Sequence, residues 1–138
     1  QDNYQMDLSE LEQMVQSDKA EGLYPTFVMA TFGSEVTLGM DPLIEIGEIA
    51  HANDLWYHID AAYAGLSSFL PEMRPLLQGI ELATSLSFEG NKWMPGLFNS
   101  TFMYLDTPKY AIESLNHTAL YVENNKGADV IDYKDYEI

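Results

Sequence analysis

Three short apolar segments separated by helical patterns constrain the fold of this chain more than any other feature. Residues 25–32, 55–59 and 83–88 combine aromatic and aliphatic side chains in runs of strand length. Helical patterns over residues 41–53 and 71–77 separate them. Because strands joined by helical crossovers pair in parallel, this alternation predicts an α/β fold with a mainly parallel sheet and helices on its faces.

A further helix is predicted ahead of the first strand, from Asp7 to about residue 21. Asp7 and Glu10 have the spacing of a capping box, and Gly22 is a stop signal. The apolar positions that recur at helical spacing are Leu8, Leu11, Met14 and Val15.

The second helix is predicted to begin at Asp41, as the capping residue, with Pro42 in the first helical position. Its inner face is predicted to consist of Ile46, Ile49 and Ala50. Residues 102–105 form a fourth predicted strand whose direction the sequence leaves open. Residues 1–121 are assigned to one unit, and the polar residues 122–138 are expected to be loosely ordered.

Composition limits the class of protein and its partners. The chain has 138 residues, the size of one domain or part of one, and 46% of them are hydrophobic. Its net charge of −16 disfavours nucleic acid and anionic membranes as partners. No apolar run reaches the roughly 18 to 20 residues that a bilayer requires. Without cysteine or an N-terminal leader pattern, we expect a cytoplasmic protein.

Two side chains with complementary chemistry follow predicted strands. Asp60 ends the second strand, and Lys92 comes shortly after the third. The carboxyl ends of parallel strands share one edge, so we expect Asp60, Lys92 and the turn at residues 33–34 on one rim. Taken alone, Lys92 is typical of a lysine on the surface, and Asp60 is typical of an aspartate in a turn. Together they suit pyridoxal phosphate, whose aldehyde forms a Schiff base with an amine and whose pyridine nitrogen a carboxylate keeps protonated.

The neighbours of both residues support this hypothesis. Ala61 and Ala62 follow Asp60, and their small side chains would let a planar ring approach closely. Burial among apolar side chains would lower the pKa of the Lys92 amine toward reactivity. The apolar residues near Lys92 in sequence are Phe88, Trp93, Met94 and Phe98.

The histidines do not point to a metal. His58 lies on a predicted buried strand and is interpreted as structural. His51 and His117 have no carboxylate or second histidine at ligand spacing, so no metal site is predicted.

Six segments carry a resemblance to a known family. They are Ala-Thr-Phe-Gly at 30–33, His-Ile-Asp-Ala-Ala-Tyr-Ala-Gly at 58–65, Pro-Glu-Met-Arg at 71–74, Gly-Ile-Glu-Leu-Ala-Thr-Ser at 79–85, Lys-Trp at 92–93 and the final residues 130–138. With these motifs the chain resembles the group II pyridoxal-phosphate decarboxylases from about residue 4 to its end. Tyr63 and Trp93 favour the aromatic-L-amino-acid, tyrosine, tryptophan and histidine decarboxylase branch over the glutamate and cysteine-sulfinate branch.

The resemblance implies a fold, a cofactor and roles for individual residues. The chain would form part of the large domain of a fold-type I, aspartate aminotransferase-like enzyme, with helices on both faces of the sheet. Lys92 would carry the Schiff base, Asp60 would pair with the pyridine nitrogen, and Ala62 would pack against the ring. Asn91 and Ser34 are weaker candidates for cofactor binding. The implied function is decarboxylation of aromatic L-amino acids to amines by a homodimer.

Several positions depart from the family pattern. Residues 89–91 read Glu-Gly-Asn where the family has Asn-Pro-His, and Glu35 follows Ser34 where the family has a threonine pair. Ala119 stands at the position of a loop tyrosine. These departures favour an alternative, a non-catalytic degenerate fragment that binds a full-length relative. The sequence leaves both alternatives open and does not identify the substrate.

Overall fold

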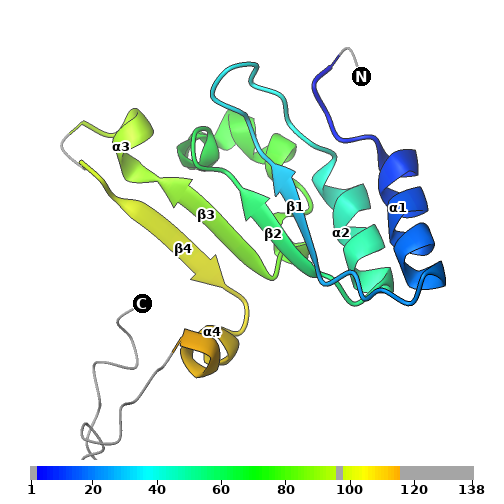
Figure 1. The fold of residues 1–138 in the computed structure, drawn as a ribbon. Coiled ribbons are helices and arrows are strands. Elements are labelled where there is room, and N and C mark those ends of the chain that lie inside the picture. Colours follow the sequence, from blue (N-terminus) through cyan, green and yellow to red (C-terminus); the bar gives the residue numbers. More distant parts are fainter. Residues whose placement is uncertain (1–2, 96–97, 116–138) are drawn as a thin grey trace, which may run out of the picture. The chain divides into compact units, whose positions relative to one another are not determined.

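The strands of this chain form one sheet in the order in which they occur along the sequence. The computed structural model describes residues 3–95 and 98–115, and it divides into two units, Gln1–Asp106 and Thr107–Ile138. The first unit holds a four-stranded sheet of order β1-β2-β3-β4 (Figure 1). Its strands are β1 (Phe27–Thr31), β2 (Trp56–Asp60), β3 (Ser85–Glu89) and β4 (Thr101–Leu105).

The strand directions place the ends of three strands at one edge of the sheet. β1 pairs in parallel with β2, and β2 with β3, whereas β4 runs antiparallel to β3. The mainly parallel sheet is therefore confirmed, and the direction of the fourth strand is settled. The last residues of the three parallel strands, Thr31, Asp60 and Glu89, consequently lie at the same edge.

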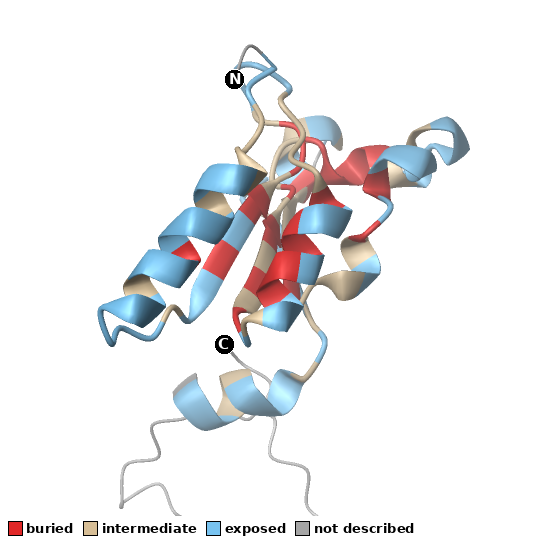
Figure 2. Cartoon of the chain, turned by 90° about the vertical axis from the view of Figure 1, so that its right-hand side faces the viewer, coloured by how far each residue is buried: buried red, intermediate tan, exposed pale blue. Residues whose placement is uncertain are grey.

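One face of the sheet carries the core. Val28 and Ala30 on β1 and Tyr57 and Ile59 on β2 alternate with more exposed neighbours, as the two-residue period of a strand requires. Helix α2 (Leu43–Ala52) covers this face with the residues predicted for its inner side, Ile46, Ile49 and Ala50, all buried. Figure 2 shows that the buried positions of α2 face the sheet while its other positions remain exposed.

Helix α1 (Leu8–Ala20) begins where its capping signal predicts. The Asp7 carboxylate accepts hydrogen bonds from the backbone N–H groups of Ser9 at 2.9 Å and Glu10 at 3.2 Å. Val15 joins the core cluster, and Leu8 and Leu11 pack against it. Met14 does not, because its side chain is exposed. The prediction of Met14 on the apolar face is therefore wrong.

The predicted capping role of Asp41 is also wrong. Pro42 occupies the N-cap position of α2, and no side chain caps that helix. The two oxygens of Asp41 instead accept hydrogen bonds from the backbone N–H groups of Met6 and Thr31, each at 2.7 Å. Asp41 thus ties the segment before α1 to the end of β1, close to the rim of the sheet.

The connection between β2 and β3 is built from short 3-10 helices. These are η1 (Gly65–Phe69), η2 (Pro71–Leu77) and η3 (Ile80–Leu82). The helix predicted at residues 71–77 is thus a 3-10 helix. Pro75 within it cannot donate a backbone hydrogen bond, which disfavours a regular α-helix.

The remaining helices are α3 (Gly90–Trp93), directly after β3, and α4 (Pro108–Leu115) in the second unit. Helix α4 was not predicted. The predicted boundary at residue 121 and the predicted loose order of 122–138 lie outside the described residues. Among the residues that the structure describes, no helix has the length and apolar character needed to cross a bilayer.

The other face of the sheet is open in the first unit. Phe27, Met29 and Met103 on this face are exposed by 55%, 45% and 58%. The helices that pack on the sheet cover only the face with the core, as far as residues 3–95 and 98–106 describe it. The second helical layer that the resemblance implies is therefore not supplied by this part of the chain.

His58 on this open face is held between two hydroxyl groups. Its Nδ1 atom lies 2.7 Å from Ser85 Oγ, and its Nε2 atom lies 3.2 Å from Ser87 Oγ. The Trp56 indole N–H also donates to Ser85 Oγ, at 2.8 Å. Burial lowers the pKa of His58, although the Asp60 charge and a hydrogen bond at Ser85 oppose this shift. The geometry agrees with the structural interpretation of His58.

Replacing Asp41 by Asn tests its tying role. The amide keeps one acceptor oxygen but loses the other, so one backbone N–H loses its acceptor. We expect the free energy of unfolding, measured by urea denaturation, to fall by about 1–3 kcal/mol. Glu12→Gln, at an exposed position of α1, is the matched control and should change it by less than about 0.5 kcal/mol. Equal effects of the two substitutions would contradict the assignment.

His58 should make stability fall in mild acid. A lowered pKa means that the folded state binds fewer protons than the unfolded state below the ordinary histidine pKa of about 6.5. Above that pH, neutral His58 costs the folded state nothing. As the pH falls below it, protonation favours the unfolded state, and the free energy of unfolding decreases. Urea unfolding between roughly pH 5 and 7.5 should show this slope in the unaltered protein and a weaker slope in His58→Gln. The exposed His51→Gln is the control, and an unchanged slope in His58→Gln would refute the prediction.

Candidate functional site

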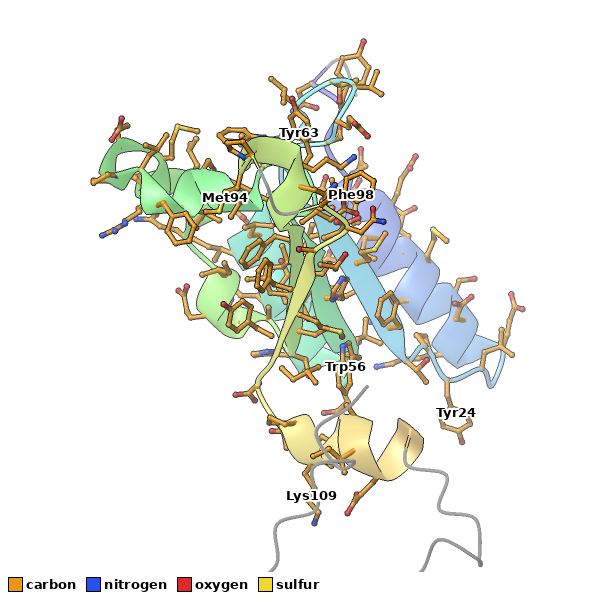
Figure 3. The ribbon with its side chains drawn as sticks, turned by 90° about the vertical axis from the view of Figure 1, so that its left-hand side faces the viewer. Tyr24, Trp56, Tyr63, Met94, Phe98 and Lys109 are labelled. Carbon is orange, nitrogen blue, oxygen red and sulfur yellow. The ribbon has the colours of Figure 1, made fainter. Side chains whose placement is uncertain are left out.

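A pocket lies at the edge where the parallel strands end. Its volume is about 250 Å³. It is lined by Thr31, Gly33, Ser34, Glu35, Asp60, Ala62, Tyr63, Glu89 and Lys92. Figure 3 shows Tyr63 at this end of the sheet and Trp56 at the opposite end. The pocket therefore occupies the position at which α/β sheets commonly bind ligands.

The segment after β1 forms one wall as a tight turn, as predicted for residues 33–34. Gly33 has a φ of 71°, and a side chain there would collide with the Ala64 methyl group. The backbone N–H groups of Gly33 and Ser34 both donate to the carbonyl oxygen of Gly39, at 3.0 and 3.1 Å. The Ser34 hydroxyl lies 2.6 Å from Thr37 Oγ1. This turn directs the following Glu35 toward the pocket.

The motif at residues 60–65 divides between site and core. The Asp60 Oδ1 atom accepts a hydrogen bond from the Ala62 backbone N–H at 2.9 Å, which orients the carboxylate. Asp60, Ala62 and Tyr63 line the pocket. Ala61 and Ala64 are buried in the core cluster instead. Positions 60, 62 and 63 of the motif therefore line the site, and positions 61 and 64 belong to the core.

Gly65, at the end of this motif, lies where the loop after β2 packs against β3. A Cβ atom there would lie 2.6 Å from Cβ of Phe88, a residue of β3. The loop after β2 can therefore lie directly on β3. This close approach holds Asp60 and Ala62 beside the end of β3, from which Lys92 follows.

Lys92 reaches the pocket from α3 as an ion-paired ammonium group. Its Nζ atom lies 3.2 Å from Glu35 Oε1 and 3.8 Å from Glu89 Oε2. The hydrogen bond to Glu35 raises the pKa of Lys92 above its ordinary value, and the charges of Glu35 and Glu89 add to this effect. Tyr63 contributes in the same direction, whereas burial opposes it.

The predicted lowering of the Lys92 pKa by apolar burial is therefore wrong. The Lys92 side chain remains 27% exposed. Trp93 and Phe98, two of its expected apolar neighbours, are themselves 44% and 86% exposed. Two carboxylates, rather than an apolar environment, thus surround the amine and favour its protonated form.

The predicted site residues do not all meet. The structure brings Asp60, Ala62, Ser34 and Lys92 together in the pocket. Asn91 is exposed and does not line it, since its side-chain amide donates to Glu89 Oε2 at 3.4 Å.

Thr31 and Tyr63 line the pocket although sequence reasoning did not assign them to the site. A signal for Thr31 was available in the sequence, because it stands near the end of the predicted strand at residues 25–32, and the structure pairs it with Asp60 on β2. The contact of Glu35 with Lys92 had no such signal, since 57 positions separate the two residues.

The residues fit the ring and aldehyde of pyridoxal phosphate better than its phosphate. An amine, a carboxylate and a small side chain line one pocket, as the ring end requires. Glu35 and Glu89, however, add two carboxylates to a lining whose one cationic side chain is Lys92. The described residues include no group of three or more His, Cys, Asp or Glu side chains suited to a metal ion.

Comparison with known proteins identifies the family. The model of the pyridoxal-dependent decarboxylase conserved domain matches residues 1–138. The aromatic-L-amino-acid decarboxylase of Manduca sexta is 35% identical over 93% of this chain and 25% of its own length. The 4-hydroxyphenylacetaldehyde synthase of Rhodiola rosea is 35% identical over 94% of this chain and 26% of its own length.

Solved structures agree with this result. The Oryza sativa TDC structure with PLP and tryptamine superposes with a TM-score of 0.86 at 32% identity, covering 97% of this chain and 28% of that one. The chain thus spans about a quarter of the length of the relatives that it matches. The family and its solved members point to pyridoxal phosphate as the cofactor. This chain belongs to the pyridoxal-dependent decarboxylase family.

Proposed function

We propose that this chain is the part of a pyridoxal-phosphate-dependent decarboxylase that supplies the lysine and the aspartate of the cofactor site. The observation that carries the proposal is the shared pocket of Asp60, Ala62 and Lys92 at the ends of β2 and β3. When bound, pyridoxal phosphate supplies an electron sink for the electrons left behind as carbon dioxide departs.

Each residue has a task that its position suits. Asp60 Oδ1 is fixed by the Ala62 N–H, so the carboxylate is oriented to hold a proton on the pyridine nitrogen. Ala62 offers a methyl group to the face of the ring. Lys92 Nζ offers the nitrogen for covalent attachment of the aldehyde carbon. Ser34 is a weaker candidate for the cofactor, because its hydroxyl already contacts Thr37.

The proposed substrate of the complete protein is an aromatic L-amino acid, decarboxylated to the amine. Relatives named as aromatic-L-amino-acid and tryptophan decarboxylases support this choice. A Catharanthus roseus tryptophan decarboxylase solved with L-tryptophan superposes with a TM-score of 0.82 at 32% identity. The complete protein is further proposed to be a homodimer, which light scattering after size exclusion would test.

Two observations favour other outcomes. The first is that the Rhodiola rosea relative is named for an aldehyde product, so amine and aldehyde must be analysed together to distinguish the two reactions. The second is the pair of carboxylates at Lys92, which favours a non-catalytic fragment that binds a full-length relative. Release of carbon dioxide with formation of an amine supports the proposed decarboxylase over both.

Cofactor attachment can be tested on the purified chain. Addition of pyridoxal phosphate in mildly alkaline buffer should produce the visible absorbance of covalently attached cofactor. Lys92→Ala should abolish it, because the variant has no amine in the pocket. Lys109→Ala, on the exposed surface of α4, is the matched control and should keep it. The same absorbance in Lys92→Ala would sink the assignment of Lys92.

The task of Asp60 requires the complete protein. Asp60→Asn preserves shape but removes the negative charge that stabilises a protonated pyridine nitrogen. We expect the rate of carbon dioxide release to fall by a factor of about 10²–10³, the size typical of losing one preorganised electrostatic group. Asp106→Asn, at an exposed residue after β4, should leave the rate unchanged. A near-normal rate in Asp60→Asn would contradict the role.

A further inference from the structure

Lys92 is held by carboxylates from two separate segments. Glu35 belongs to the turn after β1, and Glu89 is the last residue of β3. The Lys92 Nζ atom lies 3.2 Å from Glu35 Oε1 and 3.8 Å from Glu89 Oε2. The side chains of Glu35 and Glu89 are 64% and 32% exposed. Neither carboxylate therefore serves the core, and both are directed to the amine.

The other titratable groups that line the pocket do not offset these charges. Asp60 from the end of β2 brings a third carboxylate, and Tyr63 from the following loop brings a phenol. Lys92 is the one cationic side chain among the described residues of the lining. The ammonium form of Lys92 is thus the form that the charges of its surroundings favour.

We propose that Glu35 and Glu89 form a carboxylate clamp that positions Lys92 as an ammonium and opposes its covalent attachment to an aldehyde at neutral pH. The proposal rests on the proposed function, since it concerns the same amine. It makes Glu35 and Glu89 positioning residues, which act on the reaction only through Lys92.

The chemistry of attachment explains why the clamp matters. An ammonium nitrogen has no free electron pair, so Lys92 must first release one proton to solvent. The neutral nitrogen then attacks the aldehyde carbon, a carbon–nitrogen double bond forms, and the aldehyde oxygen leaves as water. Glu35 and Glu89 oppose the release of this proton, because both carboxylates lose their cationic partner when Lys92 becomes neutral.

The direction of the Lys92 pKa agrees with this clamp. The hydrogen bond to Glu35 is the largest cause of the raised pKa, and Glu89 adds a smaller charge effect. The order follows the distances, 3.2 Å and 3.8 Å. Lys109 provides a comparison, because it pairs with the single carboxylate of Glu113 at 3.5 Å on an exposed helix.

Competitive acylation of the purified chain tests the clamp without any cofactor. Trace acetic anhydride acylates a lysine amine only in its neutral form. Peptide mass spectrometry then reports the acylation of Lys92 relative to Lys109 across roughly pH 8 to 11. Glu35→Gln should raise the relative rate at Lys92 about twofold to fivefold, as expected for loss of a partly exposed ion pair. Glu89→Gln should raise it less, and the double variant should raise it most.

The controls distinguish the clamp from a general change in the protein. Glu113→Gln removes the partner of Lys109 and should leave Lys92 unchanged relative to Lys19. Circular dichroism should match in all variants, because both glutamates lie outside the core cluster. If Lys92 reacts at the same relative rate in the double variant and in the unaltered chain, the proposal is overturned.

A second measurement separates this proposal from the proposed function. Pyridoxal lacks the phosphate, so its attachment reports the amine without repulsion between phosphate and Glu35 or Glu89. In the double variant, the pH at which half of the pyridoxal attaches should shift downward. Attachment without that shift would overturn the clamp and leave the proposed function standing. Absence of attachment in every variant would count against the proposed function, while acylation would still decide the clamp.

Discussion

The parallel pairing of β1, β2 and β3 is the constraint on which the rest of the structure depends. It places Thr31, Asp60 and Glu89, the last residues of these strands, at one edge of the sheet. The core on one face then fixes which side chains alternate toward the helices and which remain open. Asp41 and Gly65 secure the two loops that border the pocket, the first by hydrogen bonds and the second by close packing.

The charges at this edge give the site its particular character. The family chemistry needs an amine that can become neutral, whereas Glu35 and Glu89 stabilise the ammonium form of Lys92. The Asp60 carboxylate, by contrast, is held by a backbone N–H in an orientation that suits the proposed task. In the proposed site, the Asp60 carboxylate is therefore oriented by the backbone, whereas the Lys92 amine is held in its ammonium form by two carboxylates.

Much of the fold could be predicted because local patterns and tertiary packing agree. The strands and the inner face of α2 follow from apolar runs and helical spacing. Asp41 was misassigned because a capping residue and a long-range acceptor look alike in sequence. The environment of Lys92 was predicted wrongly because two of its apolar sequence neighbours, Trp93 and Phe98, are exposed, and because its partner Glu35 is distant in sequence. Proximity across the sheet edge, not sequence spacing, decides these contacts.

In the proposed site, Lys92 is the lysine of this chain that receives the cofactor. Borohydride reduction after incubation with pyridoxal phosphate would make the attachment permanent, and peptide mass spectrometry would locate it. We expect the label on Lys92, with a yield that rises with pH as the ammonium loses its proton. Labelling confined to exposed lysines such as Lys109, with Lys92 unmodified at every pH, would contradict it.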